Sequence, residues 1–278
     1  MSLKVTEIGR DTVISGEENF TLKDTLDCGQ AFRWKADEKG VWSGIAGGRY
    51  LELYEGENGE IILKNTTISE YNSFWKAYFD MDRDYGKIIS EISANEILKN
   101  AAAFGKGIRI LKQEPFEAVA SFIISQNNNI PRIKGIIERL CENFGEKTDR
   151  GYLFPTAERL AGLSVEDLVP IRSGFRAKYI IDAAQKYARG EIDESVLLTG
   201  DIDSARAELE KIKGVGPKVA DCALLFGYGR IEAFPRDVWI KRAIEVLFNG
   251  NLPPEADKYA GIVQQYIFNY ARVTKLEI

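Results

Sequence analysis

Histidine is absent from this chain of 278 residues. Its absence excludes Ser-His-Asp triads, Cys-His pairs and histidine-ligated zinc sites together. Any catalysis must therefore rely on lysine, aspartate, glutamate, tyrosine or cysteine. Cysteine is scarce too, because Cys28, Cys141 and Cys222 are too few and too far apart for a disulfide framework or a four-cysteine metal site. We therefore expect no metal and no cofactor, and we expect each cysteine to be a small buried apolar side chain.

Long apolar runs are also missing. No stretch approaches the roughly 18 apolar residues that span a bilayer, and the first residues lack the apolar core of a signal peptide. The composition, with 45% hydrophobic and 28% charged residues, is that of an ordinary globular protein. We expect a cytoplasmic monomer that does not bind membranes.

Positive charge is in slight deficit, with a net charge of −5 at pH 7. An acidic chain is not typical of a protein that binds nucleic acid over its whole surface. One segment differs, because residues 171–190 carry five basic side chains and only one acidic one. The simplest interpretation of such a run is a solvated helix face. A strip that contacts phosphates is the alternative.

The hydrophobic pattern changes once along the chain. Between about residues 19 and 65, aromatic and β-branched segments separated by turn residues predict an antiparallel sheet. The expected strands are 19–22, 31–35, 41–45, 49–54 and 60–64. Beyond residue 69 helical spacing prevails, and we expect helices at 116–125, 130–144, 178–188, 205–212, 217–226, 238–248 and 259–271. The predicted fold class is α+β, with a β-rich domain at residues 1–105 and a mostly α-helical domain at residues 106–278.

The segment Lys213-Gly-Val-Gly-Pro-Lys218-Val-Ala-Asp-Cys222 joins two predicted helices through a glycine turn. Pro217 suits the first position of the second helix, so the segment predicts a helix-hairpin-helix. Gly214 and Gly216 would let the turn approach another surface closely, and the free N–H groups of the second helix would bind an anion such as a DNA phosphate. A bare Gly-x-Gly turn is more often only a tight loop.

Lys218 falls in the first turn of that second helix, where the positive end of the helix dipole favours release of a neutral amine. A neutral amine is a nucleophile, although a single lysine is by default a solvated surface residue. Nineteen residues later, Asp237 begins another helix, and its simplest role is to cap that helix.

Four motifs resemble the 8-oxoguanine DNA glycosylases of the helix-hairpin-helix superfamily. They are Cys28-Gly29-Gln30-Ala-Phe-Arg-Trp34, Ser125-Gln-Asn127-Asn-Asn129-Ile-Pro-Arg132, the hairpin segment followed by Pro235-Arg-Asp237-Val, and Tyr259-Ala-Gly-Ile-Val-Gln264-Gln-Tyr-Ile-Phe268. The resemblance covers nearly the whole chain, in the family's order. It implies that residues 1–105 contribute to the base pocket and that residues 106–278 form the glycosylase domain.

The resemblance implies a mechanism on double-stranded DNA. The damaged nucleotide is flipped out of the duplex, because C1′ of its sugar cannot be reached within the stack. Lys218 then attacks C1′, and the resulting Schiff base allows β-elimination, an abasic-site lyase activity. Asp237 stabilises the positive charge that develops on the sugar.

The resemblance also assigns residues that recognise the base. Gly29 presents its backbone carbonyl to N7–H, the donor that distinguishes 8-oxoguanine from guanine. Cys222 and Phe268 cover the two faces of the base, while Gln264 reads its Watson–Crick edge. Without the resemblance, Cys222 and Phe268 would be interpreted as core residues.

For the opposite strand, the resemblance makes Asn127 fill the vacated space, Phe175 wedge beside it, and Arg132 and Arg176 read the unpaired base. Two positions depart from the family's pattern. Phe175 stands where a tyrosine is expected and lacks its hydroxyl. Trp239 stands where a phosphate-contacting histidine is usual, and its indole N–H donates without charge. We therefore expect loose selectivity for the opposite base.

Parts of the sequence are also compatible with two other functions. A sister glycosylase would act on a different lesion, but the alkylpurine branch lacks the lysine, and the endonuclease III branch carries four cluster-binding cysteines after the hairpin. No cysteine follows Cys222. A non-catalytic protein that binds DNA through its hairpin would leave Lys218 and Asp237 unexplained.

Overall fold

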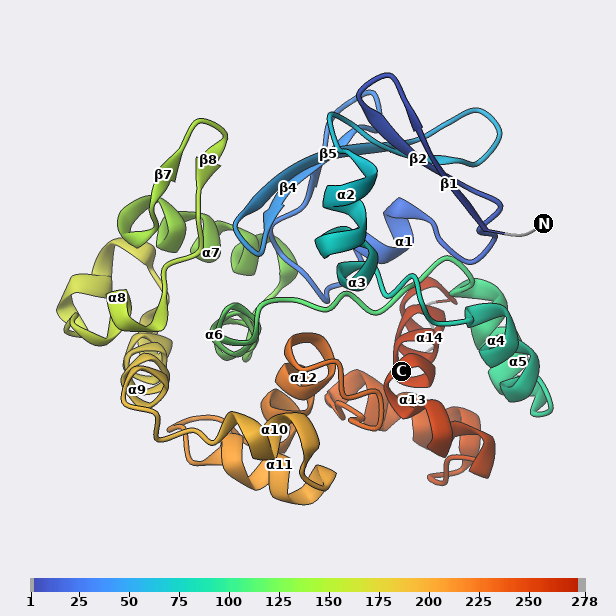
Figure 1. The fold of residues 1–278 in the computed structure, drawn as a ribbon. Helices are drawn as coiled ribbons and strands as arrows, with labels where there is room; N and C mark the ends of the chain where they lie inside the picture. Colours follow the sequence, from blue (N-terminus) through green and yellow to red (C-terminus); the bar gives the residue numbers. More distant parts are fainter. Residues whose placement is uncertain (1–2, 275–278) are drawn as a thin grey trace. The chain divides into compact units, whose positions relative to one another are not determined.

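A computed structural model describes residues 3–274 and confirms the α+β fold class (Figure 1). The described residues belong to two compact units. Unit 1 consists of Met1–Gly44, Tyr50–Lys112 and Arg236–Ile278, and unit 2 consists of Ile45–Arg49 and Gln113–Pro235. The domain boundary predicted at residue 105 stays a prediction.

A six-stranded antiparallel sheet occupies the N-terminal part of the chain, in the order β1-β2-β6-β5-β4-β3. Its strands are β1 (Lys4–Ile8), β2 (Asp11–Ser15), β3 (Lys35–Ala36), β4 (Trp42–Ala46), β5 (Arg49–Glu55) and β6 (Ile61–Leu63). Val13 of β2 pairs with Ile62 of β6, which pairs in turn with Tyr54 of β5. Alternate side chains of β5 and β6, such as Leu53 and Leu63, are fully buried, as expected for a sheet with one face on the core.

Three of the predicted strands, 41–45, 49–54 and 60–64, are confirmed within a residue or two, and two predictions were wrong. Residues 19–22 do not form a strand, because Leu22 and Leu26 are buried one turn apart in the helix α1 (Leu22–Leu26). Residues 31–35 are irregular apart from β3. This segment places the side chain of Trp34 in the core, where it is fully buried and its Nε1 donates to the Tyr78 hydroxyl at 2.8 Å.

Unit 1 contains further helical segments and a fully buried arginine. They are α2 (Ile68–Glu70), a π-helical turn (Tyr71–Trp75), α3 (Lys76–Tyr78), α4 (Tyr85–Ile92), α5 (Glu96–Phe104), α13 (Val238–Phe248), a 3₁₀ turn (Pro254–Tyr259) and α14 (Ala260–Thr274). Arg109 is fully buried, and its guanidinium donates to the backbone carbonyls of Phe79, Asp80 and Arg83. A buried charge is tolerated only with such partners. Arg109 therefore fixes the loop between α3 and α4, which supplies these three carbonyls.

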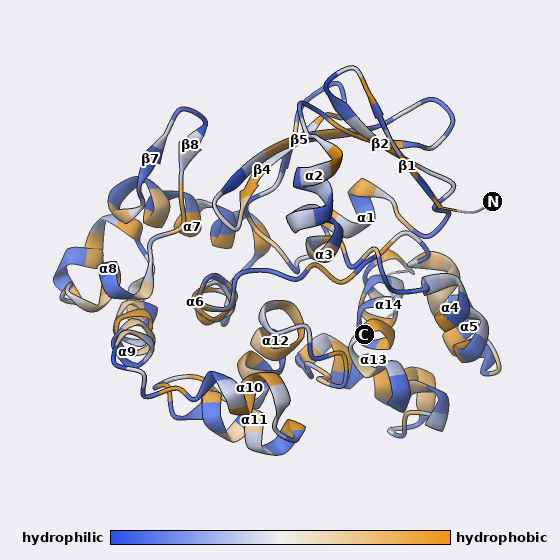
Figure 2. Ribbon diagram, viewed as in Figure 1, coloured by the Kyte–Doolittle hydropathy of each residue, from blue (hydrophilic) through white to orange (hydrophobic). Residues whose placement is uncertain are grey.

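Unit 2 is helical. It contains α6 (Pro115–Ser125), α7 (Ile130–Phe144), α8 (Ala157–Ala161), α9 (Ala177–Ala188), α10 (Glu194–Thr199), α11 (Ile202–Glu210) and α12 (Pro217–Gly227), with a short hairpin of β7 (Lys147–Thr148) and β8 (Gly151–Tyr152) and 3₁₀ turns at Glu166–Ile171 and Gly174–Arg176. The helices α6 and α12 are predominantly apolar (Figure 2) and pack together, with Phe122 stacked on Phe226 at 5.2 Å between ring centroids. Helices that are apolar around their circumference form the centre of a domain.

All seven predicted helices are confirmed, with ends that differ by no more than about three residues. Within residues 3–274, no helix has both the length and the apolar character needed to cross a membrane.

Candidate active site

The predicted site residues divide between the two units. Unit 2 carries Asn127, Arg132, Phe175, Arg176, Gly214, Gly216, Lys218 and Cys222, and unit 1 carries Gly29, Asp237, Trp239, Gln264 and Phe268. Each group is described within its own unit.

The helix-hairpin-helix forms as predicted, from α11, a turn and α12. Gly214 has φ +79°, and a Cβ there would lie 2.6 Å from the Tyr179 ring, so glycine is needed for both backbone and space. Gly216 caps α12 from an extended conformation, and Pro217 takes the first helical position. The turn is held from α9, where Asp182 accepts a hydrogen bond from the Lys213 N–H at 2.8 Å. Burial alone would raise the pKa of Asp182, but hydrogen bonds from Lys213 and Lys186 lower it.

Lys218 lies in the first turn of α12 and is half-buried. Its Nζ is 3.5 Å from the Ser125 hydroxyl and 5.5 Å from the centre of the Phe122 ring. Ser125 Oγ donates its own hydrogen to the Phe122 carbonyl, so its lone pairs face the lysine. The Lys218 amine therefore lies against α6 and does not extend into solvent. Cys222, one turn further along α12, is 3% exposed, which fits the core role as well as the base-covering role.

The three asparagines take three different roles. Asn127 is exposed, with φ +47°, a left-handed conformation that asparagine tolerates better than most residues. Asn128 donates its side-chain amide to the Ile124 carbonyl, and Asn129 caps α7 by accepting from the Arg132 N–H at 3.0 Å. The side chains of Asn128 and Asn129 are thus engaged at the end of α6 and the start of α7, and Asn127 is the asparagine that projects outward.

Arg176 is 3% exposed, and its hydrogen bonds go to other residues of unit 2. It donates to the carbonyls of Gln126, Asn127 and Ser173, and its guanidinium stacks 4.4 Å from the Phe175 ring centre. Burial lowers its pKa, and the charge of Arg132 lowers it further. Arg176 thus fastens the loop that bears Asn127 to the turn that bears Phe175.

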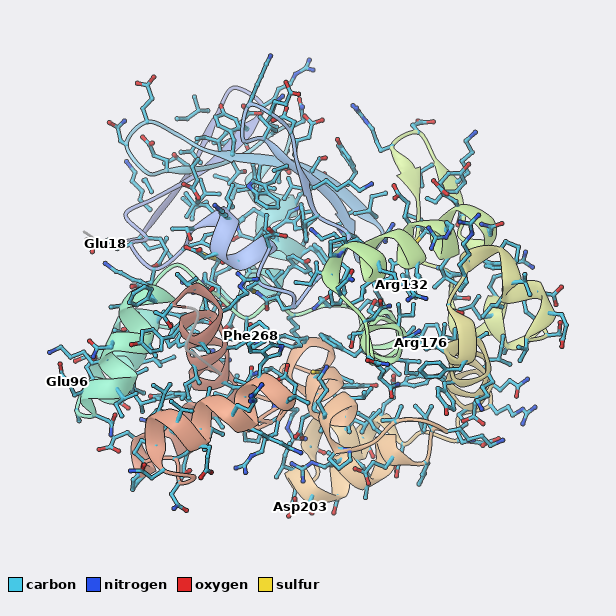
Figure 3. The ribbon with its side chains drawn as sticks, turned by 180° about the vertical axis from the view of Figure 1, so that it is seen from behind. Glu18, Glu96, Arg132, Arg176, Asp203 and Phe268 are labelled. Carbon is cyan, nitrogen blue, oxygen red and sulfur yellow. The ribbon has the colours of Figure 1, made fainter. Side chains whose placement is uncertain are left out.

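Arg132 and Phe175 are both accessible. Arg132 is exposed on α7 near Arg176 (Figure 3), and Phe175 is 53% exposed. The exposed phenylalanine ring offers an apolar face for stacking, and the exposed arginine can still donate hydrogen bonds. Asn127, Arg132 and Phe175 are therefore available to a ligand, whereas Arg176 would first have to give up carbonyl contacts.

The basic segment is less uniform than its sequence suggests. Lys186 pairs with Asp182 and Arg189 pairs with Glu191, while Arg176 is buried. Arg172 and Lys178 remain exposed. The positive surface is therefore confined to a few side chains.

In unit 1, Asp237 caps α13. Its Oδ1 accepts from the Ile240 N–H at 2.7 Å, and the residue is half-buried. Val238 and Trp239, which follow at once, are 70% and 54% exposed. This helix start therefore combines a carboxylate with two exposed apolar side chains.

Gly29 occupies a tightly held turn with φ +90°, a conformation that favours glycine. The neighbouring Gln30 is fully buried, donating to the carbonyls of Thr25 and Arg109 and accepting from the Leu111 N–H. On the other side, burial raises the pKa of the Cys28 thiol to about 11, so this cysteine is a neutral packing residue. The Gly29 carbonyl is thus presented by a rigid frame.

Gln264 and Phe268 lie one turn apart on α14. Gln264 is 4% exposed, and its Oε1 accepts a hydrogen bond from Gln265 Nε2 at 2.7 Å. Phe268 is half-exposed, unlike the buried Ile267 beside it.

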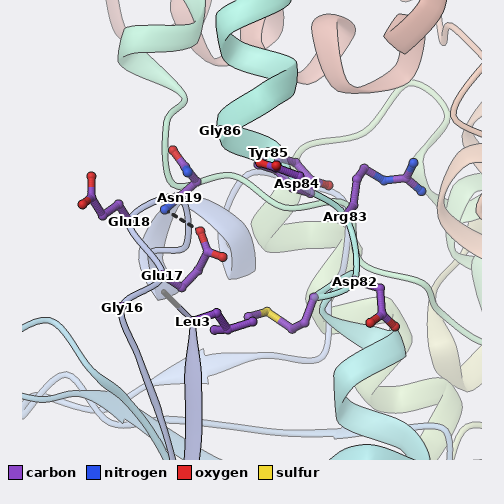
Figure 4. Close-up of a pocket in the computed structure, with 11 residues that line it drawn as sticks. Leu3, Gly16, Glu17, Glu18, Asn19, Asp82, Arg83, Asp84, Tyr85 and Gly86 are labelled. Carbon is purple, nitrogen blue, oxygen red and sulfur yellow. Dashed lines mark hydrogen bonds between the residues drawn. The ribbon is translucent and has the colours of Figure 1, made fainter. Parts of the chain in front are cut away.

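A pocket of about 390 Å³ also lies in unit 1 (Figure 4). Its lining includes Glu17, Asp82 and Asp84 but none of the predicted site residues. Glu17 faces the buried Arg109 at 3.5 Å, so part of this acidic lining balances the arginine.

Comparison with known proteins identifies the family. Residues 12–119 match the 8-oxoguanine DNA glycosylase N-terminal domain, and residues 120–263 match the HhH-GPD superfamily of base excision DNA repair proteins. This chain is a member of the 8-oxoguanine glycosylase family of HhH-GPD proteins.

Three relatives illustrate how close the family is. The structure of MBOgg1 in complex with a low-affinity DNA ligand is 41% identical, covers 99% of this chain and 100% of its own, and superposes with a TM-score of 0.90. The Clostridium acetobutylicum 8-oxoguanine glycosylase/lyase, in complex with DNA containing cytosine opposite 8-oxoguanine, is 36% identical over 99% of both chains, also with a TM-score of 0.90. The Saccharomyces cerevisiae N-glycosylase/DNA lyase is 33% identical over 80% of this chain. This chain spans 66% of the length of the yeast enzyme, slightly under two thirds.

Sequence reasoning missed the residues that hold the predicted ones in place. Ser125, Tyr179, Asp182 and Gln265 contact predicted residues or the hairpin through side chains, and Gln30 frames Gly29. Gln30 and Gln265 carried a usable signal, because each is a polar residue beside apolar ones and next to a predicted site residue. Tyr179 and Asp182 carried none, since their partners in the hairpin lie more than 30 positions away.

Proposed function

We propose that this protein excises 8-oxoguanine from double-stranded DNA and cleaves the strand at the resulting site, with Lys218 as the nucleophile. The observation that carries the proposal is the placement of Lys218, half-buried at the start of the second hairpin helix and held 3.5 Å from Ser125 Oγ. The family, and relatives named glycosylase/lyase, support the substrate and both activities.

The chemistry follows from an amine and a carboxylate. Lys218 Nζ in its neutral form attacks C1′ of the flipped nucleotide, the bond from C1′ to the base breaks, and the base leaves with the electron pair and takes up a proton. Asp237 stabilises the positive charge that builds up on the sugar during this step. Loss of a proton from the amine and opening of the sugar ring give the Schiff base. Removal of a C2′ proton then expels the 3′ phosphate oxygen.

Recognition is divided among the other predicted residues. The Gly29 carbonyl accepts from N7–H, Gln264 reads the Watson–Crick edge, and Cys222 and Phe268 contact the two faces of the base. The hairpin turn at Gly214 and Gly216 offers N–H groups to a phosphate, and the Trp239 indole N–H offers one more. On the opposite strand, Asn127 and Phe175 take the vacated space while Arg132 and Arg176 contact the unpaired base.

The location follows from the substrate. We infer that the protein works where the chromosome is, which in a cell without a nucleus is the cytoplasm. Fractionation of the source cells, with the protein followed by an antibody, tests this location.

The decisive experiment traps the Schiff base. Borohydride reduction on duplex DNA containing 8-oxoguanine should link the wild-type protein covalently to DNA, and Lys218→Gln should abolish both the link and base release while DNA binding persists. Lys213→Gln is the matched control, because Lys213 lies in the same hairpin and is exposed. Its N–H still donates to Asp182 in this variant, which loses only the 3.4 Å ion pair between Lys213 Nζ and Asp182. Trapping that survives in Lys218→Gln, or that disappears equally in Lys213→Gln, would overturn the assignment.

A further inference from the structure

Two adjacent glutamines on α14 form a side-chain pair. Gln265 Nε2 donates to Gln264 Oε1 at 2.7 Å, and the two side chains are 6% and 4% exposed. Gln265 Oε1 is buried and has no hydrogen-bond partner among the described residues. Gln265 is therefore closed off from solvent, whereas Gln264 Nε2, which also has no partner among the described residues, is not one of the fully buried atoms. The orientation of each amide is decided by the other.

The observed orientation is the less costly of two. If both amides were turned over, Gln264 Nε2 would donate to Gln265 Oε1, and the two N–H donors of Gln265 would be buried without acceptors. Orphaned buried N–H groups are rarer in proteins than carbonyl oxygens with unused lone pairs. Turning only one amide would set oxygen against oxygen or N–H against N–H. Burial of Gln265 thus selects one orientation for Gln264.

This orientation defines what Gln264 offers to a ligand. Its Oε1 is held by Gln265, and its Nε2 makes no hydrogen bond with any residue in the described part of the chain. Two N–H donors are consequently free at this position, together with the second lone pair of Oε1.

The same face of α14 continues as a polar row toward the Gly29 turn. Asn269, four residues after Gln265, donates to the Phe104 carbonyl and accepts from Arg272. Arg272 in turn lies 3.4 Å from the carbonyl of Asp27, two residues before Gly29. The helix that carries Gln264 is therefore joined by hydrogen bonds to the segment that carries Gly29.

We propose that Gln265 is a positioning residue that fixes the Gln264 amide with its N–H donors free for the base, and so sets which lesion unit 1 accepts. Guanine-type bases carry an acceptor, O6, at the edge where adenine-type bases carry an amino donor. A fixed donor at Gln264 that faces position 6 of the base thus favours 8-oxoguanine over 8-oxoadenine. This inference rests on the proposed function and assigns its base specificity to a second residue.

Two substitutions of Gln265 distinguish a role in positioning the Gln264 amide from a role in packing alone. Gln265→Met has a similar shape but forms no hydrogen bond, so the Gln264 amide can turn freely. Gln265→Glu reverses the bond when ionised, because a carboxylate only accepts and would draw Gln264 Nε2 toward itself, turning Oε1 to the base. When that carboxyl is protonated, its O–H can donate to Gln264 Oε1 and restore the original orientation.

The experiment measures single-turnover excision of 8-oxoguanine and of 8-oxoadenine, each opposite cytosine, over a range of pH. Each rate is divided by the same variant's cleavage of a duplex with a preformed abasic site, which contains no base to read. We expect Gln265→Met to lower the ratio of 8-oxoguanine to 8-oxoadenine excision about five- to tenfold, the worth of one hydrogen bond. Gln265→Glu should lower the ratio further at high pH and recover it as the pH falls.

The outcomes distinguish the two proposals. If the wild type excises neither lesion, the proposed function fails and the inference fails with it. If the wild type excises 8-oxoguanine and both variants keep its ratio at every pH, only the inference fails. A fall in melting temperature with an unchanged ratio likewise assigns Gln265 to packing alone and overturns the inference.

Discussion

Arg176 illustrates how one side chain can serve two purposes. Its guanidinium donates to carbonyls of the Asn127 loop and of Ser173, and it is almost wholly buried. Reading the unpaired base would require it to exchange some of these contacts for cytosine's acceptors. The side chain of Arg132 is exposed and makes no such hydrogen bond with the residues that the structure describes.

The two arginines should therefore respond differently to substitution. Arg132→Ala should reduce the preference for cytosine opposite the lesion by about tenfold, the lower end for a charged hydrogen bond. Arg176→Lys should lower excision opposite every base and also lower the melting temperature, because lysine cannot reproduce the planar fork that binds several carbonyls. The measurement is single-turnover excision opposite C, T, G and A, with thermal melting.

Glu142→Ala, an exposed substitution on the same helix as Arg132, is the control. Equal wild-type rates opposite all four bases would remove Arg132 and Arg176 from the list of recognition residues. If Arg176→Lys changes selectivity without changing stability, its contacts to the loop are incidental.

At the scale of elements, α13 depends on the carboxylate that we assign to chemistry. Asp237→Asn keeps an oxygen that can accept from the Ile240 N–H, and asparagine caps helices about as well as aspartate. This variant should lose excision while its melting temperature changes little. Asp237→Ala should lose excision and, because the cap is gone, about 1 kcal/mol of unfolding free energy.

Denaturant unfolding and excision kinetics on the same preparations test this pair. Asp201→Ala, which removes the N-cap of α11, is a matched control that should lose stability through the same mechanism without losing the chemical step. Excision retained in Asp237→Asn would make this carboxylate purely structural.

The elements differ in how far the sequence predicts them. The helices of unit 2 carry strong local signals, such as Pro217 after Gly216 and Asn129 before α7, so their limits follow from neighbouring residues. β1 was missed because it is charged and largely exposed at the edge of the sheet, where a strand needs little apolar pattern. β2 lies inside the sheet and alternates in burial, but it is only five residues long, which is a weak signal. The segment at residues 31–35 looked like a strand because Trp34 and Phe32 are buried. Their burial serves tertiary packing and not a ladder of hydrogen bonds.

The predicted site residues differ in the same way. Gly214, Lys218 and Asp237 stand at turns and helix starts, where local chemistry indicates their positions. The burial of Arg176 could not be foreseen, because two of its three acceptors come from a loop 49 or 50 positions away. Nor could the pairing of Gln264 with Gln265, since adjacent residues on a helix do not normally face each other.

For the whole molecule, the net charge of −5 opposes binding to DNA except where positive side chains are concentrated. Arg172 and Lys178 are the exposed members of the basic segment, and Arg189 is paired with Glu191. We expect the affinity for DNA to fall with salt, with a logarithmic slope near −0.9 for each phosphate neutralised. Arg172→Ala and Lys178→Ala should each make this slope less steep by about 1, and Arg189→Ala should change it far less.

Titration of a lesion-containing duplex at several salt concentrations measures these slopes. A flat response in the wild type would mean that the basic segment does not meet DNA. An effect of Arg189→Ala as large as that of Arg172→Ala would mean that the ion pair opens on binding.

Unit 1 is assembled from separate stretches of chain, and this has a consequence for the order of folding. Unit 2 consists almost entirely of the continuous stretch 113–235, so it can fold as soon as that stretch leaves the ribosome. Unit 1 must wait for α14, which packs against α5 about 160 residues earlier in the chain. During synthesis the lysine therefore acquires its surroundings before the glutamine and phenylalanine of α14 exist. A nascent chain halted before α14 would carry the lysine that we propose as the nucleophile without the residues that we propose to select the base.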